Sequence, residues 1–418
     1  MKLLLRSVLI VDPQSPWNGN VVDIELSNGK VTGIAKEIAL QKGFTERDCK
    51  RLSLSPGWFD LNADFAEPGE EWREDLSTGA EAAARGGFTG VLLSPLTQPV
   101  ADNKASIEYF TRRSEQTVVE LIPKGALTVG AKGENLAELF DMHQTGALAF
   151  SDDTNAVTNP NIIKLGLLYT RDFDGTVISF PHEPNICGKG VMNEGVQSTY
   201  LGLKGMPKMA EELVIERDLK LAEYTGGKLH IRTVSTKNGV ELIKAAKAKG
   251  LNITADVSIA HLLFSDSELK DYDTRWKILP PLREDEDRKA LVKGLKSGVI
   301  DAVSTDHKPQ DIESKKCEFD LASFGMLGLE TAYPLLQSIF SSEEVVRFMA
   351  IQPRQAMGLE APVIDMDQEV NFTLFDPNLK WTWTEQDAAS KSKNSPLFGR
   401  EFQGKSIGVL RGKHSVFF

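Results

Sequence analysis

The feature that most constrains the fold is a long alternation of short apolar strands with helix-like stretches, from about residue 54 to residue 357. Strand-like runs occupy residues 90–93, 176–180, 228–234, 252–257 and 302–304, and helix-like stretches include residues 208–224 and 236–248. Such alternation, sustained over roughly 300 residues, is typical of a parallel α/β sheet, and its length suits a (β/α)₈ barrel.

The chain on either side of this region has a different texture. Short β-type runs separated by turns occupy residues 3–11, 21–26 and 31–34, and β-type runs return at residues 370–375 and 406–410. The economical interpretation is a TIM barrel of residues 55–357, inserted into a composite β-sandwich that residues 1–54 and 358–418 build together.

Composition excludes several classes of protein. The formal net charge of -11 disfavours a general nucleic-acid binder, and no apolar run approaches the ~20 residues of a membrane helix. The apolar start of the chain is broken by Arg6, so we interpret it as a strand and expect a cytoplasmic protein. The three cysteines are far apart and form no CxxC pair, which supports neither a disulfide framework nor a thiolate zinc site.

Barrels of this type carry their chemistry at the carboxyl ends of the strands. The polar residues that end the strand-like runs are therefore the candidates for a functional site. They are Asp60, Asn62, Asp64, Asp152, Asp153, His182, His230, Thr233, His261, Asp306 and His307.

Several segments, in order along nearly the whole chain, resemble motifs of the dihydroorotases. The segments are SPGWFD at 55–60, EPG at 67–69 with Glu74-Asp75, GVMNEGVQSTYLG at 190–202, VSTK at 234–237, HLLF at 261–264, PPLR at 280–283, TDH at 305–307 and SKSKNSPLFGREFQG at 390–404. The resemblance implies a barrel of the metal-dependent amidohydrolase type with a β-sandwich, and a history in pyrimidine biosynthesis. The family reaction is the reversible cyclisation of N-carbamoyl-aspartate to dihydroorotate.

The metal ligands of the family are largely replaced. Zinc lowers the pKa of bound water to ~7, and neutral imidazoles are its natural ligands. The family begins its site with His-x-His, whose rings share one face of a strand; here those positions are Asn62 and Asp64, and no His-x-His occurs anywhere. The family histidine before "VST" is Thr233, whereas the histidine of the middle strand corresponds to His182.

The carboxylates of the family site remain. Asp152 or Asp153 matches the bridging carboxylate, and Asp306 matches the acid that serves as metal ligand and proton shuttle. We expect no cofactor and regard these positions as vestigial. The alternative is zinc or another divalent cation bound weakly, with the oxygen-rich set favouring Mg²⁺, Mn²⁺ or Ca²⁺. If no cation is present, the acids should repel one another, so truncating them is expected to leave assembly with a partner intact and even to stabilise the fold.

Residues that contact substrate in the family are replaced here as well as the metal ligands. Ala66 replaces the arginine that grips the substrate carboxylate, and an alanine cannot form that bidentate pair. Leu96 lies in the family's asparagine region and Leu279 replaces the asparagine before "PPLR". His261 and His307 are retained, and either histidine is equally compatible with a purely structural role.

Two functions remain open at this stage. The first is a non-catalytic dihydroorotase homologue that serves as a structural partner; inactive chains of this kind are subunits of aspartate carbamoyltransferase assemblies in some bacteria. The second is an active dihydroorotase, or a hydrolase of another cyclic amide, with a rebuilt metal site. The missing His-x-His favours the first. We accordingly expect aspartate carbamoyltransferase, further copies of the chain, or both as partners, and neither nucleic acid nor membrane.

Overall fold

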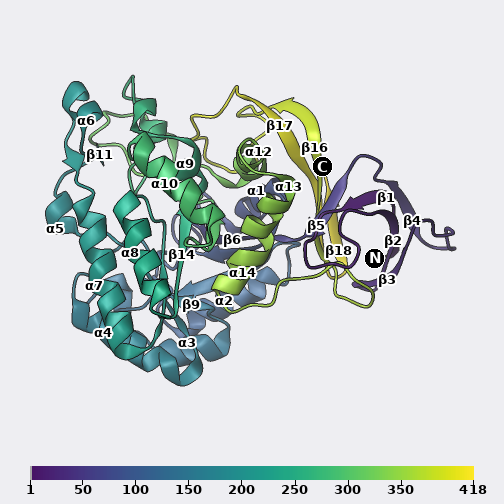
Figure 1. Cartoon of the computed structure of the whole chain (residues 1–418), viewed down its shortest axis with the longest axis horizontal. Coiled ribbons are helices and arrows are strands. Elements are labelled where there is room, and N and C mark those ends of the chain that lie inside the picture. Colours follow the sequence, from purple (N-terminus) through teal and green to yellow (C-terminus); the bar gives the residue numbers. More distant parts are fainter. Residues whose placement is uncertain (1) are drawn as a thin grey trace.

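The computed structural model describes residues 2–418 and contains a parallel barrel with a second sheet beside it (Figure 1). Eight parallel strands follow one another around the barrel in chain order. Ala63 and His307 form a parallel bridge that joins the first strand to the chain beyond the last one. The (β/α)₈ barrel predicted from the sequence is thus confirmed. Its strands are β6 (Trp58–Ala63), β7 (Phe88–Leu93), β8 (Glu120–Gly125), β9 (Ala149–Phe150), β10 (Thr176–Ser179), β13 (Lys228–Ile231), β14 (Ile253–Ser258) and β15 (Ala302–Ser304).

Helices surround the barrel strands (Figure 1). Strand residues such as those of β6 are buried on both faces, because side chains fill the barrel and helices cover its outside. No helix within residues 2–418 is long and apolar enough to cross a membrane. The main helices are α1 (Leu76–Gly86), α2 (Lys104–Ser114), α3 (Leu139–Thr145), α4 (Pro160–Thr170), α7 (Met209–Thr225), α8 (Lys237–Ala248) and α10 (Asp285–Lys296), and shorter ones are α5 (Pro184–Cys187), α6 (Val196–Leu201), α9 (Ile259–Leu263), α11 (Ile312–Lys315), α12 (Ala332–Gln337), α13 (Ser342–Val346) and α14 (Gln352–Ala356).

One strand is shorter than its apolar run predicts. The run 228–234 forms β13 only as far as Ile231, because Thr233 adopts a left-handed backbone with φ of 52°. This turn takes the chain out of the strand where the barrel opens. Helix boundaries agree within one residue for α7 and α8, since an apolar stripe and a Thr236 N-cap define them.

The second sheet combines the two ends of the chain. Its strands are β1 (Lys2–Ile10), β2 (Val21–Ser27), β3 (Lys30–Ala35), β4 (Thr45–Asp48), β5 (Ser53–Pro56), β16 (Asn371–Thr382), β17 (Glu401–Arg411) and β18 (His414–Phe417). Strand β5 pairs in parallel with β1 and antiparallel with β16, where Leu54 lies opposite Leu374. A separate apolar cluster, which includes Leu5, Ile24 and Phe372, forms its core. A two-stranded sheet of β11 (Met192–Asn193) and β12 (Gly205–Met206) lies apart from both.

Aromatic packing joins this sheet to the barrel. The Trp58 ring, at the start of β6, stacks on Tyr333 with 5.0 Å between ring centroids and lies 5.7 Å from the Phe375 ring of β16. Gly87 ends α1 with φ of 92°, and a Cβ there would come within 2.4 Å of the Trp58 ring. Glycine is therefore required at this junction for both backbone and space.

Candidate functional site

Five polar side chains meet where the barrel strands end, and we call them the central network: Asn62, Lys124, Asp153, Arg232 and Asp306. The Arg232 guanidinium forms ion pairs with both carboxylates, at 2.7 Å from Asp306. The Lys124 ammonium lies 3.3 Å from Asp153 and donates to the Asn62 carbonyl oxygen at 2.7 Å. The Asn62 amide in turn donates to Asp306 at 2.5 Å. The five side chains form a closed ring, because each of them binds two others.

The geometry distinguishes the two adjacent acids that the sequence leaves equivalent. Asp152 accepts hydrogen bonds from the backbone and hydroxyl of Thr128 and so faces the neighbouring loop, which follows β8. Asp153, with φ of 51°, points its carboxylate to Arg232 and Lys124. Asp153 is therefore the acid that occupies the barrel centre.

Asp64, the second position of the replaced His-x-His, is also engaged. The Arg73 guanidinium lies 3.3 Å from one Asp64 oxygen and donates to the Pro309 carbonyl at 2.7 Å. The other Asp64 oxygen accepts from the Ala66 amide at 2.9 Å. Asp64 thus braces the loop after β6 against the loop after β15.

A second polar layer lies on the same strands, nearer their beginnings. The His230 ring contacts Asp256 at 2.9 Å, and the Ser304 hydroxyl donates to the same carboxylate at 2.6 Å. Burial alone raises the pKa of a carboxyl, but the hydrogen bonds from His230 and Ser304 outweigh it and lower the pKa of Asp256. Asp60 accepts only from Thr305, and burial raises its pKa to about 7.

Burial and the adjacent Arg232 guanidinium both lower the pKa of the Lys124 ammonium. The carboxylates of Asp60, Asp256 and Asp306 act in the opposite direction. The cations of the central network are therefore held among acids on two layers, which is the arrangement a buried charge requires.

The backbone around the centre retains unusual conformations. Ala66, Asp153, Thr233 and Asp306 all have positive φ, between 48° and 58°. Non-glycine residues rarely adopt this region, and such strain collects at ligand sites and active sites. The Thr233 hydroxyl is buried and has no hydrogen-bond partner within residues 2–418. The backbone at the strand ends thus has conformations typical of ligand sites, although the side chains differ from those of the family motifs.

His182 is not part of the central network. Its ring stacks on Phe180 and its Nδ1 lies 3.5 Å from the Cys187 sulfur. Burial and the nearby Arg283 charge lower the pKa of His182. The structure therefore does not join this retained histidine to Asp153 and Asp306. Leu96, at a family substrate position, follows β7, and its backbone amide binds the Ser94 hydroxyl.

The other retained histidines make structural contacts. His261 is buried between the Ser258 hydroxyl, at 2.7 Å, and the Pro280 carbonyl, at 3.1 Å. His307 accepts from the Gly328 amide at 3.1 Å. Leu279 packs beside a small apolar cluster that contains Cys187 and Met206. These contacts explain His261 and Leu279 without a ligand, whereas the His307 Nε2 is buried and has no hydrogen-bond partner within residues 2–418.

Sequence reasoning missed three cations, namely Lys124, Arg232 and Arg73. A signal was present for the first two, since LIPKG and LHIRT each place one basic residue at the end of an otherwise apolar strand run. A charge there is expensive unless it is paired, which points to acidic partners. The partners themselves come from other strands and cannot be read from either segment.

The donor set does not fit the zinc that the family resemblance implies. Within residues 2–418 no group of three His, Cys, Asp or Glu side chains is arranged to hold a metal ion. Asn62 and Arg232 hydrogen-bond to the Asp306 oxygen, and Lys124 and Arg232 bind the two Asp153 oxygens. A guanidinium and an ammonium repel a cation, so the site in this form offers zinc no ligands.

The parallel barrel joined to a sheet from both termini defines an amidohydrolase-type fold. L-hydantoinase (dihydropyrimidinase) from Arthrobacter aurescens matches it with a TM-score of 0.85 at 20% identity, over 99% of this chain and 96% of the other. Dihydropyrimidinase from Brevibacillus agri matches with a TM-score of 0.83 at 18% identity, over 100% and 95% of the two chains.

Sequence relatives identify the family within this class. A "Dihydro-orotase-like" family model matches residues 51–239. A dihydroorotase of Geotalea daltonii is 36% identical over 98% of both chains, and one of Pelotomaculum thermopropionicum is 39% identical over 100% of this chain and 98% of the relative. The chain belongs to the dihydroorotase family.

Proposed function

We propose that this chain is a catalytically degenerate member of the dihydroorotase family that acts as a structural partner of aspartate carbamoyltransferase. One observation carries the first half of the proposal: Arg232 pairs with both Asp153 and Asp306, the acids that the family uses at its metal centre. The side-chain cations of Arg232 and Lys124 thus bind the acids that hold a metal ion in the family reaction. We infer that it is cytoplasmic, as pyrimidine synthesis requires.

The Asp306 environment argues against a proton shuttle. A general base must be free to accept a proton from its substrate. The Asp306 Oδ1 accepts instead from Arg232 at 2.7 Å and from Asn62 at 2.5 Å, so this oxygen is already occupied by the central network. Ala66, with its methyl side chain, adds no replacement for the substrate-binding guanidinium.

The surface offers a candidate contact for a partner. Val196 and Tyr200 lie four residues apart on α6 and are 80% and 82% exposed, so they project from the same side of the helix. Tyr272, 49% exposed, donates to the Leu201 carbonyl and so lies beside them. Helix α6 is at the end of the barrel opposite the composite sheet (Figure 1). Exposed aromatic side chains of this kind are enriched in protein interfaces.

Co-elution tests the partnership. The full chain and the aspartate carbamoyltransferase of the same organism should elute together in size-exclusion chromatography at micromolar concentration and low salt. Tyr200→Asp should weaken the complex, whereas Tyr224→Asp, a similarly exposed residue at the end of α7, is the matched control. Asp153→Ala destabilises the fold but, under conditions in which the chain remains folded, should leave the complex intact, because the barrel centre is buried. If the two proteins never co-elute, the scaffold role is wrong.

Turnover tests the degenerate site separately. We expect no dihydroorotase activity at any pH with zinc, cobalt or manganese supplied. Acid–base catalysis by the remaining side chains would accelerate the reaction only ~10²–10⁴-fold. Enzymes typically accelerate their reactions by ~10⁶-fold or more. A rate that Asp306→Ala abolishes would instead favour an active cyclic-amide hydrolase with a rebuilt site; a rate that survives this change comes from a contaminant.

A further inference from the structure

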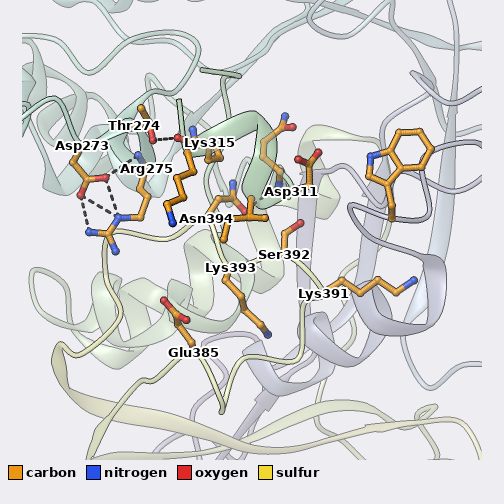
Figure 2. Close-up of a pocket in the computed structure, with 14 residues that line it drawn as sticks. Asp273, Thr274, Arg275, Asp311, Lys315, Glu385, Lys391, Ser392, Lys393 and Asn394 are labelled. Carbon is orange, nitrogen blue, oxygen red and sulfur yellow. Dashed lines mark hydrogen bonds and ion pairs between the residues drawn. The ribbon is translucent and has the colours of Figure 1, made fainter. Parts of the chain in front are cut away.

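A cavity of about 520 Å³ lies outside the central network and is lined in part by the loop that follows β15 (Figure 2). Its walls come from three barrel loops and the C-terminal segment, represented by Trp72, Arg275, Lys315 and Lys393. The volume is within the range of small-molecule sites, which is roughly 300–1,000 Å³. The lining shares residues 391–394 with the family-like segment 390–404, but neither the central network nor the proposed function uses this cavity.

The charge of the lining is opposite to that of the protein. Five basic side chains and three acidic ones line the cavity, although the whole chain carries a net charge of -11. Two of the basic groups are already neutralised. Arg275 forms a bidentate pair with Asp273, with one distance of 2.7 Å, as Figure 2 shows, and Lys391 pairs with Asp75.

The three remaining lysines, Lys315, Lys316 and Lys393, form no ion pair with any carboxylate of residues 2–418. Lys393 donates only to the backbone carbonyls of Ala388 and Ser390, at 2.9 and 2.7 Å. Lys316 is exposed at the cavity rim. The lining also contains two further acids, Asp311, which accepts from the Ser314 amide, and Glu385, so the three lysines outnumber the two remaining carboxylates.

Lys315 is the informative member of this set, because it is only 5% exposed. Its ammonium donates to the carbonyls of Ser323 and Gly325 at 2.8 and 3.0 Å, which satisfies hydrogen bonds but not the charge. Burial, with a smaller effect of nearby Lys277, lowers its pKa to about 7. All three N–H groups of Lys315 are used by backbone carbonyls, since that of Lys277 also accepts, at 3.4 Å, and the Asp273 carboxylate opposes the lowering of its pKa. Lys315 therefore adds positive charge to the cavity wall, which favours an anionic ligand.

The rim also offers apolar surface. Trp72 is 64% exposed and Ile312 is 73% exposed, and both line the cavity. An exposed indole is a platform on which a planar ring can stack. Inorganic ions alone would leave this surface in water.

We propose that the cavity binds a small organic anion, phosphorylated or carboxylated, with its charged group beside Lys315, Lys316 and Lys393 and a planar apolar part against Trp72. A phosphate and a carboxylate both offer lysine negatively charged oxygen acceptors, so the experiment must distinguish between these two head groups. The site is independent of the barrel centre and of any partner.

Calorimetric titration of the full chain at low salt tests the proposal with four probes: phenyl phosphate, benzoate, inorganic phosphate and phenol. Phenyl phosphate or benzoate should bind one to one, at least about tenfold more tightly than inorganic phosphate or phenol. The tighter of the two identifies the head group. Tryptophan fluorescence should change on binding, and Trp72→Ala should remove that change.

Matched charge variants locate the site. Lys316→Glu should weaken binding at least about tenfold, because it reverses a charge at the rim. Lys36→Glu makes the same change at an exposed lysine of the composite sheet and should leave affinity within about twofold. The proposal is overturned if neither aromatic anion binds at about 10 mM, if inorganic phosphate or phenol binds as tightly, or if Lys316→Glu has no effect.

Discussion

Replacing Arg232 by alanine should destabilise the protein severely, since this one guanidinium holds two buried carboxylates. Its side chain is only 4% exposed, so solvent does not screen the loss. Removing one partner of a buried ion pair costs about 3–5 kcal/mol, because the other charge remains buried. Asp153 keeps Lys124 at 3.3 Å and Asp306 keeps Asn62 at 2.5 Å. These surviving contacts place the expected cost near the lower end, at about 3 kcal/mol.

Equilibrium unfolding in denaturant measures this cost, with Lys220→Ala as the control. Lys220 pairs with Glu216 at 2.7 Å but is 70% exposed, so its loss should cost under about 1 kcal/mol. Adding Asp306→Asn to Arg232→Ala should cost less than the sum of the two changes, because the second removes a charge that the first leaves unpaired. A cost below about 1 kcal/mol for Arg232→Ala, or full additivity, would refute the reasoning.

Three further outcomes are expected. Elemental analysis of the purified protein should find no stoichiometric zinc; about one tightly held ion per chain would contradict the fit described above. Restoring imidazoles with Asn62→His, Asp64→His and Thr233→His should give tight zinc binding only when Arg232→Ala is added, and equal zinc content with and without it would disprove the blocking role of Arg232. Burial, aided by the Arg283 charge, lowers the pKa of His261 from 6.5 to about 4. As the pH falls, the unfolded chain therefore takes up the proton before the folded chain does, and the free energy of unfolding should fall by about 2 kcal/mol from pH 7 to pH 5. Denaturant unfolding at both pH values should show a smaller fall for His261→Gln.

The fold was predictable because its signals are local. Each barrel strand is an apolar run of a few residues and each helix a stripe of matching period, so neighbouring residues suffice to indicate both. The end of β13 was misjudged because Val234 continues the apolar run, while the turn at Thr233 depends on tertiary contacts. The backbone of Val234 donates to Asp256, on the next strand, and that bond lies outside any local pattern.

The site was predictable only in part. Strand-end positions indicated Asp306 and either Asp152 or Asp153 as site residues, and the structure brings Asp153 and Asp306 together in the central network. The sequence analysis assumed that these acids are unpaired and repel one another. That assumption is wrong, because Arg232 and Lys124 form ion pairs with them. Truncating Asp153 should therefore leave two buried cations poorly paired and destabilise the fold. The cations come from strands far away in sequence, so only the closed barrel reveals the pairing.

The placement of β5 between β1 and β16 has a consequence for synthesis on the ribosome. Strand β5 is made long before its partner β16, because Leu54 pairs with Leu374. Until then, β5 presents an unpaired edge and the apolar face around Leu5 and Ile24 lacks its Phe372 cover. Exposed edges of this kind promote aggregation of nascent chains. Products that terminate before β16 therefore retain an exposed edge that favours aggregation, and pairing with β16 removes it.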